Sequence, residues 1–141
     1  MRIDHALEIQ ASSQEVWSVL IDVERWPEWT PTMETVRRLD DGPFRLGSSA
    51  SIKQPQLPEA VWRVTAFTPG RQFTWETHVR GMRMIGSHEL VDSPAGCTSR
   101  LMLEVSGLLA WILWPLVRRN SRRAMETENS RLAERCRGSG H

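Results

Sequence analysis

This 141-residue chain has no tyrosine, and two further absences narrow its function: it lacks clustered cysteines and a long hydrophobic run. Cys97 and Cys136 are its two cysteines, too few for a disulfide framework and too far apart in sequence for the close spacing of a metal site. The apolar run at 108–117 contains Pro115 and is far shorter than the ~20 residues that a transmembrane helix needs.

The net charge and the N-terminal residues also give little indication of a partner or of export. The formal net charge is +1, so the chain as a whole has no electrostatic bias toward nucleic acid, and we expect no nucleic-acid partner. The first ten residues, MRIDHALEIQ, alternate and stay polar, unlike the apolar core of a signal peptide. A cytoplasmic location is therefore expected.

Catalytic and cofactor motifs are missing from the sequence. It contains no Gly-rich phosphate loop, no nucleophile elbow, no HExxH and no Cys/His constellation. His5 and His88 together with a carboxylate could bind a metal, but their spacing does not favour it. We expect neither a cofactor nor a metal.

The hydrophobic pattern begins with one strand and two short helices. Residues 3–10 alternate as a half-buried strand does. Ser12 or Ser13 can then cap a helix, and Ser12 with Glu15 has the spacing of a capping box. Residues 22–31 form a second short helix or turn, interrupted by Pro27.

Strands and a long helix follow. The predicted strands are 33–39, 47–54, 59–67, 72–79, 82–91 and 97–106, and most are separated by Gly/Pro turns. From residue 108 to about 137 the pattern is helical, with Pro115 as an early kink or break. Residues 1–137 are expected to form one domain, and 138–141 a flexible tail or tag remnant.

This element order predicts an α+β fold. The apolar face of a seven-stranded antiparallel sheet must be covered, and the C-terminal helix is the only large element available to cover it. A strongly curved sheet wrapped around this helix would leave an internal space wherever the inward side chains do not meet.

Several segments together resemble the polyketide cyclase/dehydrase and lipid-transport family of the START-like (SRPBCC) superfamily. The residues that carry the resemblance are Trp17 with Asp22, Trp26-Pro27-Glu28-Trp29, Gln54-Pro55, Trp62 with Val64, and Phe73 with Trp75. The resemblance covers essentially the whole chain. It implies a helix-grip fold with a deep hydrophobic cavity, used by some members for binding or transfer and by others for cyclisation.

The aromatic residues have two interpretations. Strand periodicity places Trp62, Val64 and Ala66 on one face of their strand, and Phe73 and Trp75 on one face of the next. These rings either fill an ordinary core or form the wall of a ligand cavity. The second interpretation predicts a set of ligand-binding residues: Trp29, Gln54, Trp62, Val64, Phe73, Trp75, Met84, His88, Leu103 and Trp111.

His88 is the single candidate for catalysis. It is in phase with Met84, Gly86 and Leu90, so a titratable imidazole lies on an apolar face. It could contact a ligand, act as a general acid or base, or be a core histidine whose partner is a carbonyl or Glu104.

Two further segments remain ambiguous. Trp26 and Trp29 are about one helical turn apart, on a short helix that the resemblance places at the cavity mouth, and they form either a gate there or a pair of anchors. Trp111 and Trp114, followed by a run of arginines, suit a bilayer interface or the buried end of the long helix, and we favour the buried end. A helical stripe recurs at four-residue steps: Leu116, Asn120, Ala124, Glu128, Leu132 and Cys136. Its polar members, Asn120 and Glu128, either weaken the stripe as an inward face or reach into the cavity.

The leading hypothesis is binding, or transport, of a hydrophobic small molecule that is lipid-like or polyketide-like. The first alternative is an acid/base cyclase or dehydratase using His88, and the second is an interaction module with a solid core. We favour a non-enzymatic protein, a monomer or homodimer. Transient membrane contact would use the segment around Trp111 and Trp114.

Overall fold

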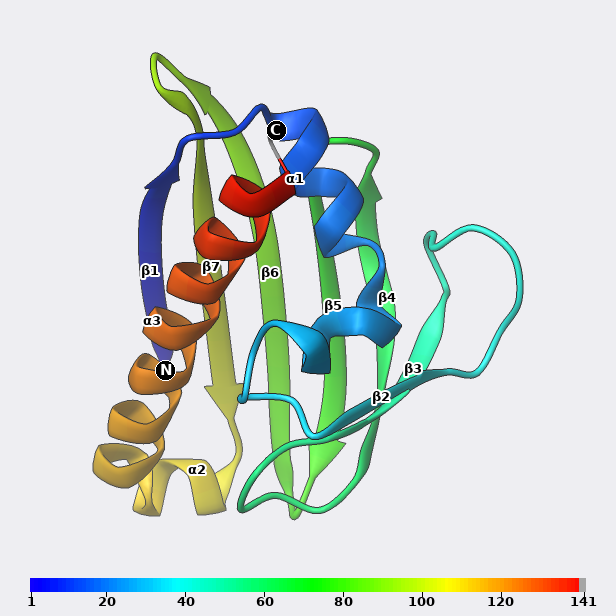
Figure 1. Ribbon diagram of the computed structural model, residues 1–141. Helices are drawn as coiled ribbons and strands as arrows, with labels where there is room; N and C mark the ends of the chain where they lie inside the picture. Colours follow the sequence, from blue (N-terminus) through cyan, green and yellow to red (C-terminus); the bar gives the residue numbers. More distant parts are fainter. Residues whose placement is uncertain (140–141) are drawn as a thin grey trace.

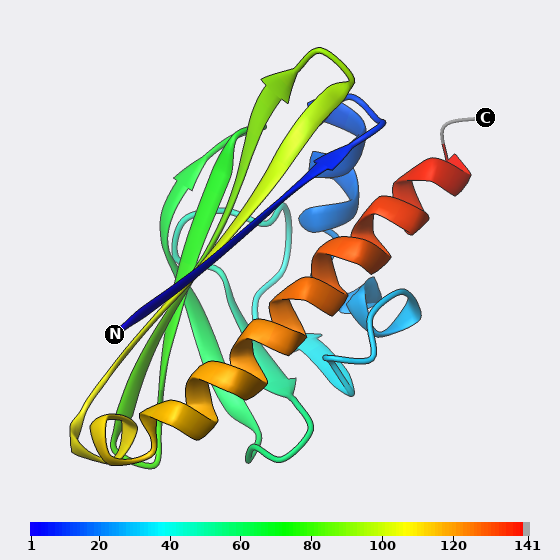
Figure 2. The ribbon, with the colours of Figure 1, turned by 90° about the vertical axis from the view of Figure 1, so that its left-hand side faces the viewer.

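The computed structural model describes residues 1–139. An antiparallel sheet of seven strands forms one layer, three of the helices lie on one side of it, and the short helix α2 lies at its lower end (Figures 1 and 2). The elements follow the predicted order: β1 (Arg2–Ile9), α1 (Ser13–Leu20), the 3-10 helix η1 (Val23–Glu28), β2 (Thr35–Arg38), β3 (Ser49–Lys53), β4 (Ala60–Thr68), β5 (Gln72–Val79), β6 (Met82–Ser93), β7 (Gly96–Ser106), α2 (Leu108–Ile112) and α3 (Trp114–Ser139).

The strand order is β1-β7-β6-β5-β4-β3-β2, so the first strand forms one edge of the sheet and pairs with the last strand. The other neighbours are consecutive in sequence and antiparallel. Figure 2 shows α3 crossing the sheet obliquely, with α1 and η1 beside it on the same face. The predicted α+β class and seven-stranded antiparallel sheet are confirmed.

The predicted alternation of strand faces holds, with one exception in β4. Trp62 and Val64 are buried as expected, but the pairing with β5 shifts register between Val64 and Ala66. Such a β-bulge rotates the following residues onto the other face. Phe67 therefore packs on the core beside Trp17, where Ala66 was expected.

The C-terminal helical segment is divided into two helices beside Pro115, where a kink or break was predicted. α2 ends after one turn with Leu113 at its C-cap, and Pro115 lies in the first turn of α3. Proline has no N–H to donate, so the first turn is where a helix tolerates it best. Before α2, Gly107 has φ +115, and a Cβ there would lie 2.4 Å from the carbonyl oxygen of Gly81. This glycine lets the chain turn tightly against the β5–β6 hairpin.

The inward face of α3 differs from the predicted stripe. Leu132 and Cys136 are buried as expected, but Leu116 is 57% exposed and Asn120 is exposed. A strict four-residue step advances about 40° per step around a helix of 3.6 residues per turn. The early members of the stripe have therefore rotated to the outside, and Met125 and Asn129 are buried instead.

The interpretation of the segment around Trp111 and Trp114 as a buried helix end is wrong for α2, whereas Trp114 and Val117 in α3 are partly buried against the core. Trp111 is 72% exposed, and Ala110 is the buried residue of α2. The break at Leu113 separates α2 from α3, so α2 does not follow the long helix across the sheet. α3 itself extends to Ser139, two residues into the predicted tail, and 140–141 lie outside the described residues. The flexible tail stays a prediction.

Candidate functional site

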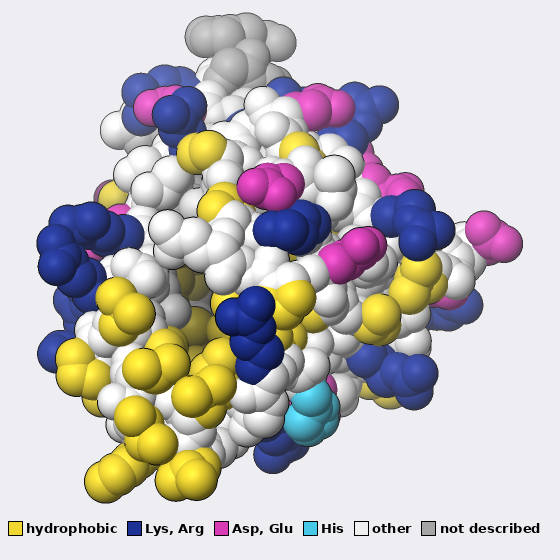
Figure 3. Space-filling model, turned by 90° about the horizontal axis from the view of Figure 1, so that it is seen from below, with side chains coloured by type: hydrophobic (Ala, Val, Ile, Leu, Met, Phe, Trp, Pro, Cys, Tyr) yellow, Lys and Arg dark blue, Asp and Glu magenta, His cyan; other side chains and the backbone are white. Residues whose placement is uncertain are grey.

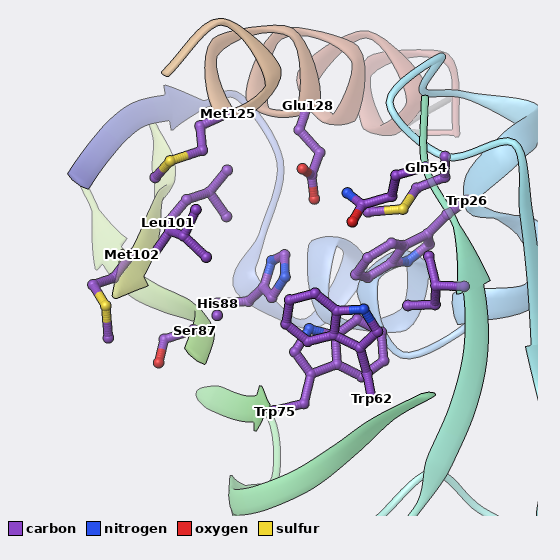
Figure 4. Close-up of a pocket in the computed structure, with 14 residues that line it drawn as sticks. Trp26, Gln54, Trp62, Trp75, Ser87, His88, Leu101, Met102, Met125 and Glu128 are labelled. Atoms are coloured by element: carbon purple, nitrogen blue, oxygen red, sulfur yellow. The ribbon is translucent and has the colours of Figure 1, made fainter. Parts of the chain in front are cut away.

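A small cavity lies between the inner face of the sheet and α3, and Figure 4 shows its lining side chains. Its volume is about 80 Å³. Binding pockets for small molecules measure roughly 300–1,000 Å³, so the space is much smaller than the deep cavity that the resemblance implies. The lining residues are Trp26, Met33, Ile52, Gln54, Trp62, Trp75, Gly86, Ser87, His88, Leu101, Met102, Leu103, Met125 and Glu128.

Aromatic rings occupy much of the room on the sheet side. Trp75 contacts Trp62, Trp26 and Phe73, with ring centroids 5.8, 5.4 and 5.3 Å apart. Phe44 meets the edges of Phe73 and Trp75 as well. Tilted and edge-on contacts of this kind are the favoured geometries of aromatic pairs. Trp62 is thus both a core residue and part of the cavity wall.

Trp26 is an anchor. Its indole is completely buried, and Nε1 donates a hydrogen bond to the carbonyl oxygen of Leu20 at 3.1 Å. That bond ties η1 to the end of α1 and fixes the ring against the cavity. Trp29, the other member of the proposed gate, is also buried, but its Nε1 has no hydrogen-bond partner among residues 1–139.

His88 enters the cavity from β6. Its ring stacks on Phe73 with a centroid distance of 4.8 Å, and the side chain is 7% exposed. Nδ1 is buried with no hydrogen-bond partner in the described chain. Glu104, the partner considered from sequence, is exposed on the outer face. Burial lowers the pKa of His88 to about 4, so the imidazole is neutral near pH 7.

Glu128 reaches the cavity from the opposite wall. Figure 4 shows its carboxyl group pointing from α3 toward the space that His88 and Gln54 also face. Burial raises the pKa of Glu128 to about 7, because a desolvated carboxylate is disfavoured relative to the neutral acid. The cavity therefore combines an apolar wall with a neutral base, a carboxyl group that is about half protonated at neutral pH, and an amide.

A separate polar cluster joins α3 to the first and last strands. Asn129 is fully buried and accepts a hydrogen bond from Ser99 Oγ at 2.9 Å, while its Nδ2 lies 2.8 Å from His5 Nδ1. Asn129 Nδ2 also donates to the Ser99 carbonyl oxygen at 3.3 Å. His5 thus has a partner from α3, and the cluster fixes how α3 sits on the sheet.

The structure brings together half of the ligand-binding residues predicted from sequence. Gln54, Trp62, Trp75, His88 and Leu103 line the cavity. Four others are buried outside its lining: Trp29, Val64, Phe73 and Met84. Trp111 lies on the surface, away from it.

Several lining residues were not predicted as site residues. Ile52 and Leu101 are ordinary apolar strand positions, and Trp26 was interpreted from sequence only as a gate or an anchor. Glu128 did carry a signal, because it and Asn120 are the polar members of the helical stripe and suggested polar groups reaching into the cavity. Among residues 1–139, no group of three His, Cys, Asp or Glu side chains is arranged to hold a metal ion.

Comparison with known proteins identifies the family. The family described as polyketide cyclase / dehydrase and lipid transport matches residues 1–137. No curated protein is significantly similar to the chain. Solved structures share its fold at low sequence identity, and several align with nearly the whole chain.

The protein TTHA0849 from Thermus thermophilus superposes with a TM-score of 0.81 at 13% identity, covering 100% of both chains. The Zhui aromatase/cyclase from a Streptomyces species gives 0.76 at 18% identity, covering 99% of this chain and 98% of that one. A START superfamily protein from Mycobacterium smegmatis gives 0.75 at 16% identity, covering 97% of each. The fold is thus the START-like helix-grip fold, and the chain belongs to the polyketide cyclase / dehydrase and lipid transport family.

Proposed function

We propose that the protein binds a hydrophobic small molecule between the sheet and α3, with His88, Glu128 and Gln54 as its polar contacts. The observation that carries this proposal is the unpaired Nδ1 of His88 at an otherwise aromatic wall. A buried polar atom without a partner costs free energy, and a ligand hydroxyl or carbonyl group would remove that cost. Membership of a family that includes lipid transport supports the same function.

The small volume sets a condition on this proposal. A ligand that needs more than about 80 Å³ enters only if lining side chains move. Met33 and Met125 line the cavity, and methionine side chains are unbranched and readily adopt new rotamers. We therefore expect binding to displace these side chains and leave the Trp26 anchor in place.

Gly86 gives a direct test. A Cβ at this position would lie 3.6 Å from Trp75 and 3.7 Å from Trp62, which is ordinary van der Waals contact. Gly86→Ala should therefore fold normally while filling part of the cavity. Binding of apolar probes such as 1-naphthol is measured by quenching of tryptophan fluorescence. We expect the affinity to fall at least tenfold in Gly86→Ala.

Trp111→Ser is the matched control, because Trp111 is exposed outside the cavity and could bind probes at the surface. This variant should retain probe affinity. Equal affinity in the native protein and Gly86→Ala, or binding that is lost only in Trp111→Ser, would refute the cavity as the binding site. An absence of probe binding would favour the interaction module with a solid core.

Acid/base catalysis is the second candidate, favoured by two titratable groups, His88 and Glu128, that line the same cavity from opposite walls. Neutral His88 can take a proton from a carbon next to a carbonyl group, while the acid form of Glu128 gives one to the carbonyl oxygen. The product is an enol, the species from which ring closure or loss of water proceeds. Once a ligand has been identified, the His88→Gln variant should still bind it but should form no product from it.

A further inference from the structure

A hydrophobic surface covers α2 and the start of α3. Leu108 and Trp111 are 74% and 72% exposed, and four neighbours are exposed to a lesser degree: Leu109, Ile112, Leu113 and Leu116. We call these six residues the α2 patch. Figure 3 shows hydrophobic side chains gathered on this face of the molecule, beside a hollow. Single exposed apolar residues are normal, but a contiguous patch marks a surface that binds something.

Basic residues continue directly from the patch. The first turns of α3 carry exposed arginines that form no ion pair with the described residues: Arg118, Arg119, Arg122 and Arg123. Leu116, Arg119 and Arg123 recur at steps of three and four, so they share one helical face. No acidic residue occurs between Glu104 and Glu126. The positive charge here is therefore local, although the whole chain is close to neutral.

We infer that the α2 patch and this arginine cluster dock the protein on an anionic lipid bilayer, with α2 lying in the interface. Large apolar side chains next to arginines are the composition of interfacial helices, and anionic headgroups attract the arginines. Among residues 1–139, no helix is long and apolar enough to cross a membrane, so the segment would lie on the bilayer. The inference is independent of the cavity and of any ligand in it.

Charge also argues against a second copy as the occupant. A symmetric contact brings the same surface of two chains together, so the arginine cluster of one copy would approach that of the other. Repulsion between them opposes such a dimer. An anionic bilayer satisfies the apolar and the basic parts of the surface at once.

Flotation with lipid vesicles tests the inference. The native protein should bind vesicles of phosphatidylcholine mixed with phosphatidylglycerol at least tenfold better than vesicles of phosphatidylcholine alone, and added salt should weaken this binding. Replacing all four arginines by glutamine should remove the preference. Leu108→Ser with Trp111→Ser and Ile112→Ser should lower the partition coefficient at least tenfold. The control Leu46→Ser changes a residue that is 62% exposed elsewhere and should have no effect.

Tryptophan fluorescence gives a second readout. Trp111 is the one exposed indole of the seven, since the others are buried or partly buried. Quenching by aqueous acrylamide therefore reports mainly on Trp111, and anionic vesicles should suppress it. Equal binding to both kinds of vesicle, or unchanged binding in the triple serine variant, would overturn the inference. A dimer in solution that the serine variant dissociates would overturn it in favour of self-association.

Discussion

Replacing Glu128 by glutamine should expose a pH dependence of stability that the native protein conceals. Burial raises the pKa of Glu128 from 4.5 to about 7 and lowers that of His88 from 6.5 to about 4. The folded protein therefore binds the Glu128 proton more tightly than the unfolded chain does, and binds the His88 proton less tightly.

The two shifts change the free energy of unfolding in opposite directions. The Glu128 contribution falls as pH rises from 4.5 through 7, whereas the His88 contribution rises between pH 4 and 6.5 and is complete above that. One pH unit corresponds to about 1.4 kcal/mol when a proton is fully bound in one state only. Between about pH 5 and 6.5 each group then changes stability by about 1–2 kcal/mol, and the two changes nearly cancel.

Urea unfolding followed by circular dichroism measures the effect. From about pH 5 to 6.5, Glu128→Gln should gain about 1–2 kcal/mol relative to the native protein, or roughly 0.5–1 M in the urea midpoint. The double variant with His88→Gln should lose that gain. All other titrating groups are common to the proteins, so the difference between the two profiles isolates Glu128.

Glu126→Gln is the matched control, because this neighbouring side chain on α3 is exposed, and its pH profile should follow that of the native protein. Identical profiles for native and Glu128→Gln proteins would refute the argument. The carboxyl group would then be in contact with water in the folded state, and the polar wall of the cavity would not exist as described.

Two substitutions test the packing around the cavity. Trp62→Ala should lower the free energy of unfolding, measured by heat or urea, by about 3–5 kcal/mol. The variant should also bind larger probes than the native protein does. If the largest probe that binds is unchanged, Trp62 is not part of the cavity wall. Asn129→Leu leaves Ser99 and His5 without their hydrogen-bond partner and should lower the free energy of unfolding by about 2–4 kcal/mol. The control Ser130→Leu changes an exposed neighbour and should lower it by less than about 1 kcal/mol. Equal losses in the two variants would contradict a structural role for the cluster.

Strand faces could be predicted because they depend on local alternation. His88 lies on the inner face with Met84 and Leu90, as periodicity indicates, and Glu76 pairs across strands with Arg83 at 3.0 Å. The bulge after Val64 could not be predicted from the sequence, because it leaves no break in the apolar pattern. A residue there moves to the other face only through pairing with a neighbouring strand.

The cavity itself was harder to predict, since its volume depends on how rings from separate elements meet. Trp26 comes from η1 and Trp75 from β5, and their contact, with ring centroids 5.4 Å apart, depends on how these two elements pack in the tertiary structure. The early part of the α3 stripe was wrong for a related reason. Positions at four-residue steps drift about 40° per step around α3, so which of them face inward depends on where along the helix the sheet meets it.

Native mass spectrometry of protein purified without detergent, followed by extraction of any bound compound, tests the central claim most directly. The account predicts a reproducible extra mass that denaturation releases and that is reduced in Gly86→Ala. A clean mass for the unliganded chain, together with tryptophan fluorescence that no hydrophobic probe quenches, would contradict it. The space between sheet and α3 would then be a packing defect in a solid core.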